Sequence, residues 1–162
     1  MADSFTTADA GTPGRAERRR WMAVLARSAA EEISAHLAAC PALPGWRVLR
    51  GPESGLVMVR GRAGGGGALF NLGEMTVTRC TVRTGSGTDG FTGHAYVAGR
   101  DARQAELAAA VDAMLQDASL HGVLTELVIE PLTAAQRARR ADVAAKAAAT
   151  KVQFFALRNM RS

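Results

Sequence analysis

The stretch RAGGGGALFNLGEMTVTRCTVR, residues 62–83, contains residue types that bind phosphate. Its four consecutive glycines, Gly64–Gly67, would offer unobstructed backbone N–H groups, and arginines stand before and after them. A phosphate-binding loop also needs Lys and then Ser or Thr at the start of a helix whose N-terminus faces the phosphate. The glycines are followed instead by ALFNL, which is typical of a strand, and a dinucleotide-binding fingerprint fails for the same reason. We therefore expect the glycines to form the connection of a β-hairpin.

Arg79 has an unusual position in the strand that follows the glycines. Strict alternation puts it on the same strand face as Met75 and Val77. If that face is covered, Arg79 needs a buried acidic partner. A bulge near Thr78 would instead turn the side chain away from the face. The simplest alternative is a two-sided strand with Arg79 at its solvated edge.

The other reactive groups are isolated in the sequence. His94 shares a predicted strand face with Tyr96, but no Cys, Asp or Glu stands at ligand spacing, so we expect no metal site. An independent phosphate-ester enzyme would have to rely on His94 and Arg79 alone. Cys40 and Cys80 have no paired spacing, which indicates a reducing compartment rather than a zinc or disulfide framework.

Arginine supplies nearly all of the positive charge, and the net charge is +5. Two clusters, at residues 15–20 and 136–140, stand near predicted helix starts, where positive charge is unfavourable. They indicate either solvated faces or contacts with acidic groups on another molecule. A basic nucleic-acid-binding module is the alternative function, although neither cluster contains an aromatic residue.

The composition predicts one ordinary globular domain. The 162 residues are 48% hydrophobic but only 5% aromatic, so the core is thin and would gain stability from a partner. We expect residues 1–16 to be disordered and residues 17–162 to form a single domain. The apolar stretches are too short to span a membrane, and the N-terminus lacks the cationic start and apolar run of a signal peptide. These features favour a cytoplasmic protein.

The pattern predicts an α+β fold, with an antiparallel β-meander of about five strands, N-terminal helices, a central helix and a long Ala-rich C-terminal helix. The connections between the strands are too short for helical crossovers, so neighbouring strands should pair antiparallel. The strands are expected at Trp46–Leu49, Leu56–Arg62, Ala68–Leu72, Met75–Arg83 and Thr92–Ala98. A further short strand or extended segment is expected at Leu124–Ile129, ended by Pro131.

Capping residues indicate where the helices begin. The expected starts are near Glu17, at Ser28 with Glu31, at Asp101 with Gln104, and at Thr133 with Gln136. The last helix is expected to continue to about Leu157. A helix of roughly 25 residues would be nearly 40 Å long, which is more than a domain of this size needs. Its length and its many alanines indicate packing against a partner chain.

Four segments, read in order, carry a resemblance. They are RRRWMAVLARSAAEEI, SGLVMVRGRAGGGGALFNLGEMTVTRCTVR, HAYVAGRDARQAELAAAVDAMLQD and VIEPLTAAQRARRADVAAKAAATKVQFFAL. Together they resemble the phosphonate metabolism PhnG family, although the glycine tract lacks the Thr that more typically interrupts it in the family. The resemblance implies no catalytic residue in this chain. The matching positions that we regard as candidate functional or interface residues are Arg79, Gly99, Arg100 and Asp101.

The resemblance implies an accessory subunit, the G subunit of the carbon–phosphorus lyase core complex. It would work with the H, I and L proteins to transfer an alkylphosphonate to C1′ of the ATP ribose with release of adenine, before the J subunit cleaves the product. It implies a dimer of G–H–I–J protomers in which the G and I subunits pack closely. It also implies that ATP is a substrate of the complex, that this chain binds no cofactor, and that neither a membrane nor a nucleic acid is a partner.

Overall fold

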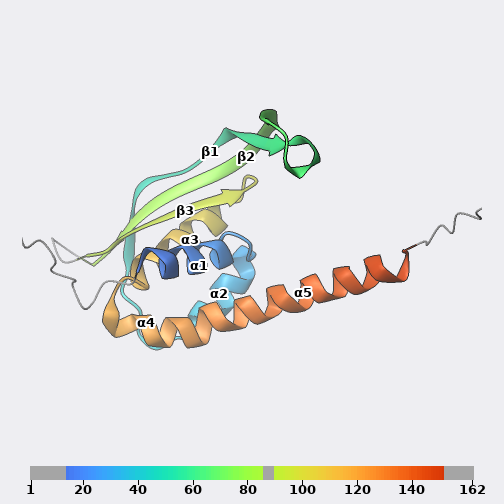
Figure 1. Cartoon of the computed structure of the whole chain (residues 1–162). Helices are drawn as coiled ribbons and strands as arrows, with labels where there is room; N and C mark the ends of the chain where they lie inside the picture. The colour runs from blue at the N-terminus through green and yellow to red at the C-terminus, as the bar shows by residue number, and fades with distance from the viewer. Residues whose placement is uncertain (1–13, 86–89, 152–162) are drawn as a thin grey trace, which may run out of the picture.

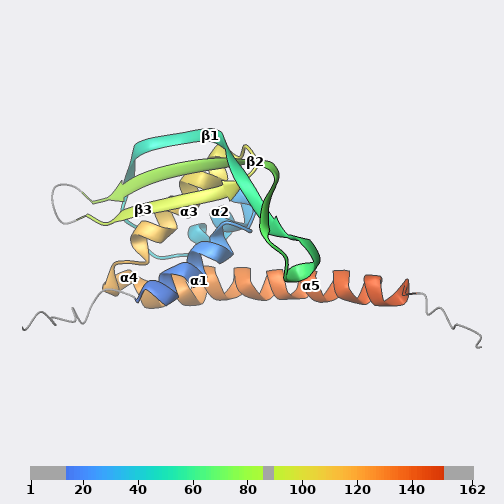
Figure 2. The same ribbon diagram turned by 45° about the horizontal axis from the view of Figure 1, so that its top comes forward.

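The computed structural model describes residues 14–85 and 90–151. A twisted sheet forms the top layer in Figure 1, shorter helices lie beneath it, and a long helix forms the bottom layer. The helices lie on one side of the sheet, which Figure 2 shows from a second direction. The α+β class is therefore confirmed. Residues 1–13 of the segment expected to be disordered lie outside the described residues.

The sheet of the described residues has three antiparallel strands, in the order β1 (Trp46–Arg62), β2 (Leu69–Thr84) and β3 (Thr92–Ala98). The expectation of about five strands is wrong, because the first two predicted strands are one strand and the next two are another. Gly51 and Pro52 suggest the end of a strand, but β1 stays paired with β2 through two register shifts, one between Val48 and Arg50 and one between Arg50 and Glu53. Gly51 has a φ of 77°, a conformation that glycine adopts readily.

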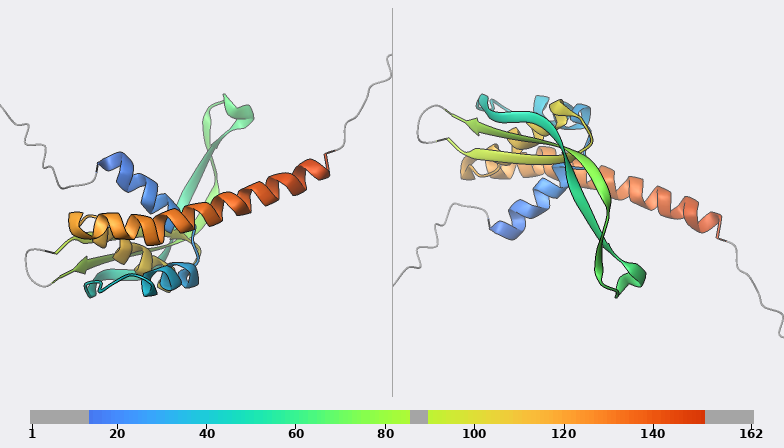
Figure 3. Two further views of the ribbon diagram at one scale, coloured as in Figure 1. Left: turned by 90° about the horizontal axis from the view of Figure 1, so that it is seen from below. Right: turned by 90° about the horizontal axis from the view of Figure 1, so that it is seen from above.

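The first two strands continue beyond the end of β3 as a two-stranded arm. The last residue of β3 pairs with Val77, whereas β1 and β2 remain paired out to Arg62 and Leu69. A short 3-10 turn at Ala63–Gly65 closes the arm, and Arg62 Nη1 donates to Gly67 O over 2.9 Å. The glycine run is thus the hairpin connection that the sequence predicts. Figure 3 shows the arm projecting away from the helices.

The central helix, α3 (Ala102–Met114), packs against β2 and β3 and is buried around most of its surface. Asp101 caps it as predicted, since its Oδ1 accepts from Gln104 N over 2.8 Å. The helix approaches the sheet closely at Gly93, where an added Cβ would lie 2.0 Å from Ala109 O. Small residues on both sides therefore set the distance between helix and sheet.

The N-terminal helices α1 (Arg15–Leu25) and α2 (Ala30–Ala38) pack on α3. The predicted capping box of Ser28 with Glu31 is wrong. The Ser28 hydroxyl donates back to Val24 O over 3.0 Å, and the residue before α2 is Ala29, whose N–H donates to the Glu32 carboxylate over 3.1 Å. Helix α1 begins two residues before the predicted start near Glu17.

The chain is helical without a break from Ala118 to Ala149, so the predicted strand or extended segment at Leu124–Ile129 is wrong. Helix α4 (Ala118–Leu124) passes through a π-helical turn directly into α5 (Glu130–Ala149). Leu124 and Val128 are both buried at a spacing of four, which is the period of a helix and not of a strand. The predicted start at Thr133 is wrong for the same reason, because the helix has already begun.

The described part of α5 ends at Ala149, and the predicted extension to Leu157 lies outside the described residues. The outer half of α5 extends well beyond the rest of the fold in Figures 1 and 3. Among the described residues, no helix is both long enough and apolar enough to cross a membrane.

Candidate functional site

The face of the sheet that points away from the helices, called the outer face below, collects polar side chains. In β2 and β3 the residues facing the helices are buried and those between them are more exposed, as alternation requires. The pairing register places these side chains of β1, β2 and β3 together. The outer-face residues of the three-stranded part include Arg47, Arg50, Glu53, Arg79, Thr81, Arg83, His94 and Tyr96.

Arg79 lies on the predicted face of β2 and has an acidic partner. Its Nε donates to Glu53 Oε1 over 2.8 Å, and both side chains are 42% exposed. Arg50 Nε donates to the same oxygen over 2.9 Å. The strand is the middle one of the sheet, so Arg79 is not at a solvated edge, and the adjacent register shift is in β1 rather than near Thr78. The Arg79–Glu53 ion pair therefore lies beside the register shift between Arg50 and Glu53 in β1.

Arg50 and Arg79 share the Glu53 carboxylate, and this sharing shifts the pKa values of Glu53 and Arg79. Hydrogen bonds from Arg50 and Arg79 lower the pKa of the Glu53 carboxyl, and the hydrogen bond to Glu53 raises the pKa of Arg79. Glu53 therefore stays ionised and holds the Arg79 guanidinium in place.

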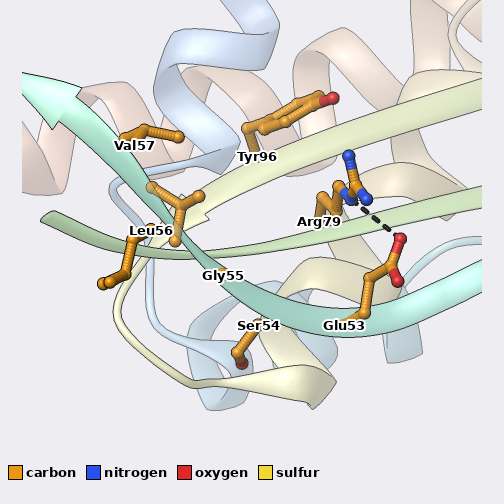
Figure 4. Close-up of a pocket in the computed structure, with 8 residues that line it drawn as sticks. Glu53, Ser54, Gly55, Leu56, Val57, Arg79 and Tyr96 are labelled. Atoms are coloured by element: carbon orange, nitrogen blue, oxygen red, sulfur yellow. Dashed lines mark hydrogen bonds and ion pairs between the residues drawn. The ribbon is translucent and has the colours of Figure 1, made fainter.

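A shallow cavity of about 190 Å³ lies beside this ion pair on the outer face. Figure 4 shows Arg79, Tyr96 and Val57 on one side of the sheet, with Ser54 and Leu56 pointing to the other. The volume is below the roughly 300–1,000 Å³ of pockets that enclose drug-sized ligands. Its size suits a single side chain or a small anion.

The other three candidate residues lie in the turn between β3 and α3. Gly99 N donates to Thr76 O over 2.9 Å, and Gly99 O accepts from Thr78 Oγ1 over 2.8 Å. Gly99 has a φ of 95°, so a side chain there would be strained. Asp101 is the cap of α3. These two residues shape the turn.

Arg100 is exposed in the same turn and makes no hydrogen bond or ion pair within the described part of the chain. Of the four candidates, Arg79, Gly99 and Asp101 make hydrogen bonds within the described residues, and Arg100 does not. The structure brings the turn next to β2, but Arg79 points to the outer face whereas Thr78 points towards the helices.

A buried carboxylate that the sequence does not single out links three elements. Asp112 of α3 accepts from Arg18 Nη2 over 2.7 Å, from Trp21 Nε1 over 2.8 Å and from His94 N over 2.9 Å. Its side chain is 1% exposed. The carboxylate thus ties α1 and the edge of β3 to α3, which gives the RRRWM segment a structural role.

A second buried polar cluster fixes the turn between α1 and α2. Gln104 of α3 donates to Ser28 O over 2.7 Å, and Gln136 of α5 donates to Ser28 Oγ and Val24 O, each over 2.9 Å. Gln104 and Gln136 were predicted as capping residues of helix starts. In the structure their side chains instead satisfy the backbone and hydroxyl of this turn.

In each of the two arginine clusters, at residues 15–20 and 136–140, one arginine forms an ion pair within the fold. Arg18 binds Asp112, and Arg139 forms an ion pair with Glu32. The remaining arginines of both clusters are exposed; they are Arg15, Arg19, Arg20, Arg137 and Arg140. Within residues 14–85 and 90–151, no group of three or more His, Cys, Asp or Glu side chains is arranged to hold a metal ion.

The segments that make these contacts lie within a match to a known protein family. The family model described as phosphonate metabolism protein PhnG matches residues 16–159. The chain belongs to the PhnG family. A relative from Rhizobium meliloti (strain 1021), named alpha-D-ribose 1-methylphosphonate 5-triphosphate synthase subunit PhnG, is 43% identical over 157 residues, which cover 97% of each chain. The match to the PhnG family includes the arm, the outer face and both buried polar clusters.

Proposed function

We propose that this chain is the PhnG subunit of an alpha-D-ribose 1-methylphosphonate 5-triphosphate synthase and acts in the catabolism of organic phosphonates. The observation that carries the proposal is the 43% identity to a protein of that name over 97% of both chains. In the proposed reaction, an alkylphosphonate displaces adenine from C1′ of the ATP ribose. The chain itself is proposed to hold no cofactor, and ATP is a substrate of the assembled complex.

The proposed partners are the H, I, J and L proteins of the same pathway, with the I subunit packed closest to this chain and the protomers arranged as a dimer. An uncovered sheet face and an exposed, alanine-rich outer half of α5 support a role inside an assembly, because both offer area without a covering element. The arginines on the outer face also suit contacts with acidic groups.

Reconstitution tests the proposed function. ATP and methylphosphonate are incubated with the H, I and L proteins, with and without this chain, and adenine and the ribose 1-methylphosphonate product are followed by chromatography and ³¹P NMR. We expect the phosphonate product to form only when the chain is present. A reaction without methylphosphonate separates transfer from simple hydrolysis of ATP.

Two results would contradict the proposal. One is formation of the phosphonate product at the same rate without this chain. The other is release of adenine from ATP by the purified chain alone, which would make it an independent enzyme rather than a subunit.

A further inference from the structure

The outer face continues without interruption from the sheet into the arm, and its chemical character changes along the way. In the three-stranded part it carries four arginines and one glutamate: Arg47, Arg50, Arg79, Arg83 and Glu53. In the arm, the register and the alternation place only apolar residues and glycines on this face. They are Gly55, Val57, Val59, Gly61, Phe70, Leu72, Gly73 and Met75.

A bulge explains why this side of the arm is uniformly apolar. Val59 pairs with Gly73 and Arg60 with Asn71, so Leu72 is an extra residue in β2. Its side chain covers Gly61, where an added Cβ would lie 2.6 Å from Leu72 Cδ1. The bulge thereby keeps Leu72 and Phe70 on the outer face and places Asn71 on the other side, where alternation already puts Arg60 and Glu74.

The apolar side chains on the outer face of the arm are exposed in the described chain. The exposed fractions are 61% for Leu72, 45% for Phe70 and 43% for Met75. A two-stranded ribbon has no core of its own and is at best marginally stable in water. Exposed apolar patches of this kind mark surfaces that contact another molecule.

We infer that the outer face is a docking surface for a different subunit of the complex, which presents an apolar ridge against the arm and carboxylates against the arginines. This inference rests on the proposed function and adds to it the face and the chemistry of the contact. The charge distribution selects the carboxylates, because among the described residues of that face Arg47, Arg50 and Arg79 have Glu53 as the only acidic residue beside them.

The same charges argue against other occupants. Two copies stacked through their outer faces would bring two sets of four arginines together in a chain whose net charge is already +5. A nucleic acid would leave the apolar arm without a partner, because no cation lies on that half of the face.

The segments outside the described residues lack the combination that the surface needs. Residues 152–162 contain Phe154 and Phe155 but no acidic residue, and residues 86–89 contain Asp89 but no large apolar residue. Residues 1–13 contain two aspartates but Phe5 as their one aromatic residue, which is too little for an apolar ridge. We therefore expect the partner on this surface to be a separate polypeptide that provides both the apolar ridge and the carboxylates.

Two matched substitutions in the arm test the inference. Leu72 and Leu56 are 61% and 62% exposed, and they lie on opposite faces of the arm. Leu72→Glu and Leu56→Glu are made in the full chain, and thermal unfolding confirms that both variants are folded. The binding affinity of each chain is measured for the other subunits of the complex, co-purified without this chain. We expect Leu72→Glu to bind at least about 30-fold more weakly, as for a side chain central to an interface, and Leu56→Glu to lose less than about threefold.

A second pair tests the charged half of the surface. Arg47→Glu changes the outer face, and Arg60→Glu changes the opposite face of the arm. We expect Arg47→Glu to weaken binding at 50 mM NaCl more than at 500 mM, because salt screens the attraction to the partner's carboxylates, and Arg60→Glu to have a smaller effect.

Each outcome decides between the occupants. Wild-type chain that does not bind the other subunits overturns the proposed function as well as the inference. Wild-type binding with equal losses for Leu72→Glu and Leu56→Glu overturns the inference alone. Three other results would also overturn the inference. The first is that the isolated chain dimerises and Leu72→Glu abolishes the dimer, and the second is that it binds single-stranded DNA tightly and Arg47→Glu abolishes that binding. The third is that the affinity of the wild-type chain for the other subunits rises when residues 152–162 or 1–13 are deleted.

Discussion

Replacing Asp112 with Asn should destabilise the fold strongly, although the two side chains have nearly the same shape. Both oxygens of Asp112 accept two hydrogen bonds: Oδ1 from Arg18 Nε and Trp21 Nε1, and Oδ2 from Arg18 Nη2 and His94 N. An amide keeps one of these oxygens. Its NH₂ group then faces two donors, whichever way the amide is turned.

The size of the effect follows from the burial of this cluster. The Asp112 side chain is 1% exposed, so water cannot replace the two lost acceptor contacts. Hydrogen bonds to a charged group contribute roughly 1.5–3 kcal/mol each, and removing one charge of a buried pair costs about 3–5 kcal/mol. Arg18 is 31% exposed and recovers some solvation. We therefore expect the free energy of unfolding to fall by about 3–5 kcal/mol.

Urea unfolding followed by tryptophan fluorescence and circular dichroism measures this change. Asp112→Asn should lower the midpoint with little change in the urea dependence of the free energy. Asp142→Asn is the matched control, because Asp142 is 60% exposed in an ion pair with Lys146, and it should cost less than about 0.5 kcal/mol. A double-mutant cycle with Arg18→Met should give a coupling energy of at least about 1 kcal/mol. A loss below about 1 kcal/mol for Asp112→Asn would show that the carboxylate does not hold the three elements together.

Three further substitutions have definite expected outcomes in the same unfolding assay. Gly93→Ala should cost about 2–3 kcal/mol, because the new Cβ would lie 2.0 Å from Ala109 O, whereas Gly55→Ala, with open space around it, should be nearly neutral. Gln136→Leu should cost about 1–2 kcal/mol, since it removes two donors to the α1–α2 turn; an unchanged midpoint would contradict that role. Glu32→Gln should cost about 1 kcal/mol or less at pH 7. The hydrogen bond from Arg139 lowers the pKa of Glu32 in the folded state, so this contribution is present above the unfolded pKa and is lost as the pH falls through the folded value. A difference from wild type that does not shrink as the pH is lowered would be inconsistent with it.

Local signals in the sequence predict the parts of the fold that local interactions determine. Asp101 caps α3 through a residue three positions away, and the alternation in β2 correctly places Arg79 on the same strand face as Met75 and Val77. The hairpin at the glycine run depends on a short turn. In each case the residues that decide the structure are neighbours in the chain.

Interactions between distant residues explain the errors. Gly51 and Pro52 resemble a strand end, but pairing with β2 carries β1 past them. Val128 and Ile129 have a high β propensity, and burial of Leu124, Val128 and Leu132 against α1 and α2 outweighs it. A count of apolar residues at a spacing of four would have indicated this helix.

The candidate site shows the same division. The sequence indicates that Arg79 needs an acidic partner, but Glu53 is 26 positions earlier and is identified only by the register of β1 on β2. Trp21 and Asp112 are 91 positions apart, and no local pattern connects them. The four outer-face arginines are also separated in the chain and form one surface only after the strands pair.

The Asp112 cluster also bears on how a partner can approach the sheet. The N–H of His94 and the C=O of Thr92 point away from β2 at the free edge of β3, where an added strand would pair. Asp112 accepts from His94 N, and Arg18 and Gln116 donate to Thr92 O, so that end of the edge is already satisfied by side chains. Addition of a strand along the whole of β3 would have to displace these side-chain contacts to His94 N and Thr92 O. A partner therefore gains more by covering the outer face, where apolar and cationic side chains are exposed and no internal contact has to be lost, than by extending the sheet at β3.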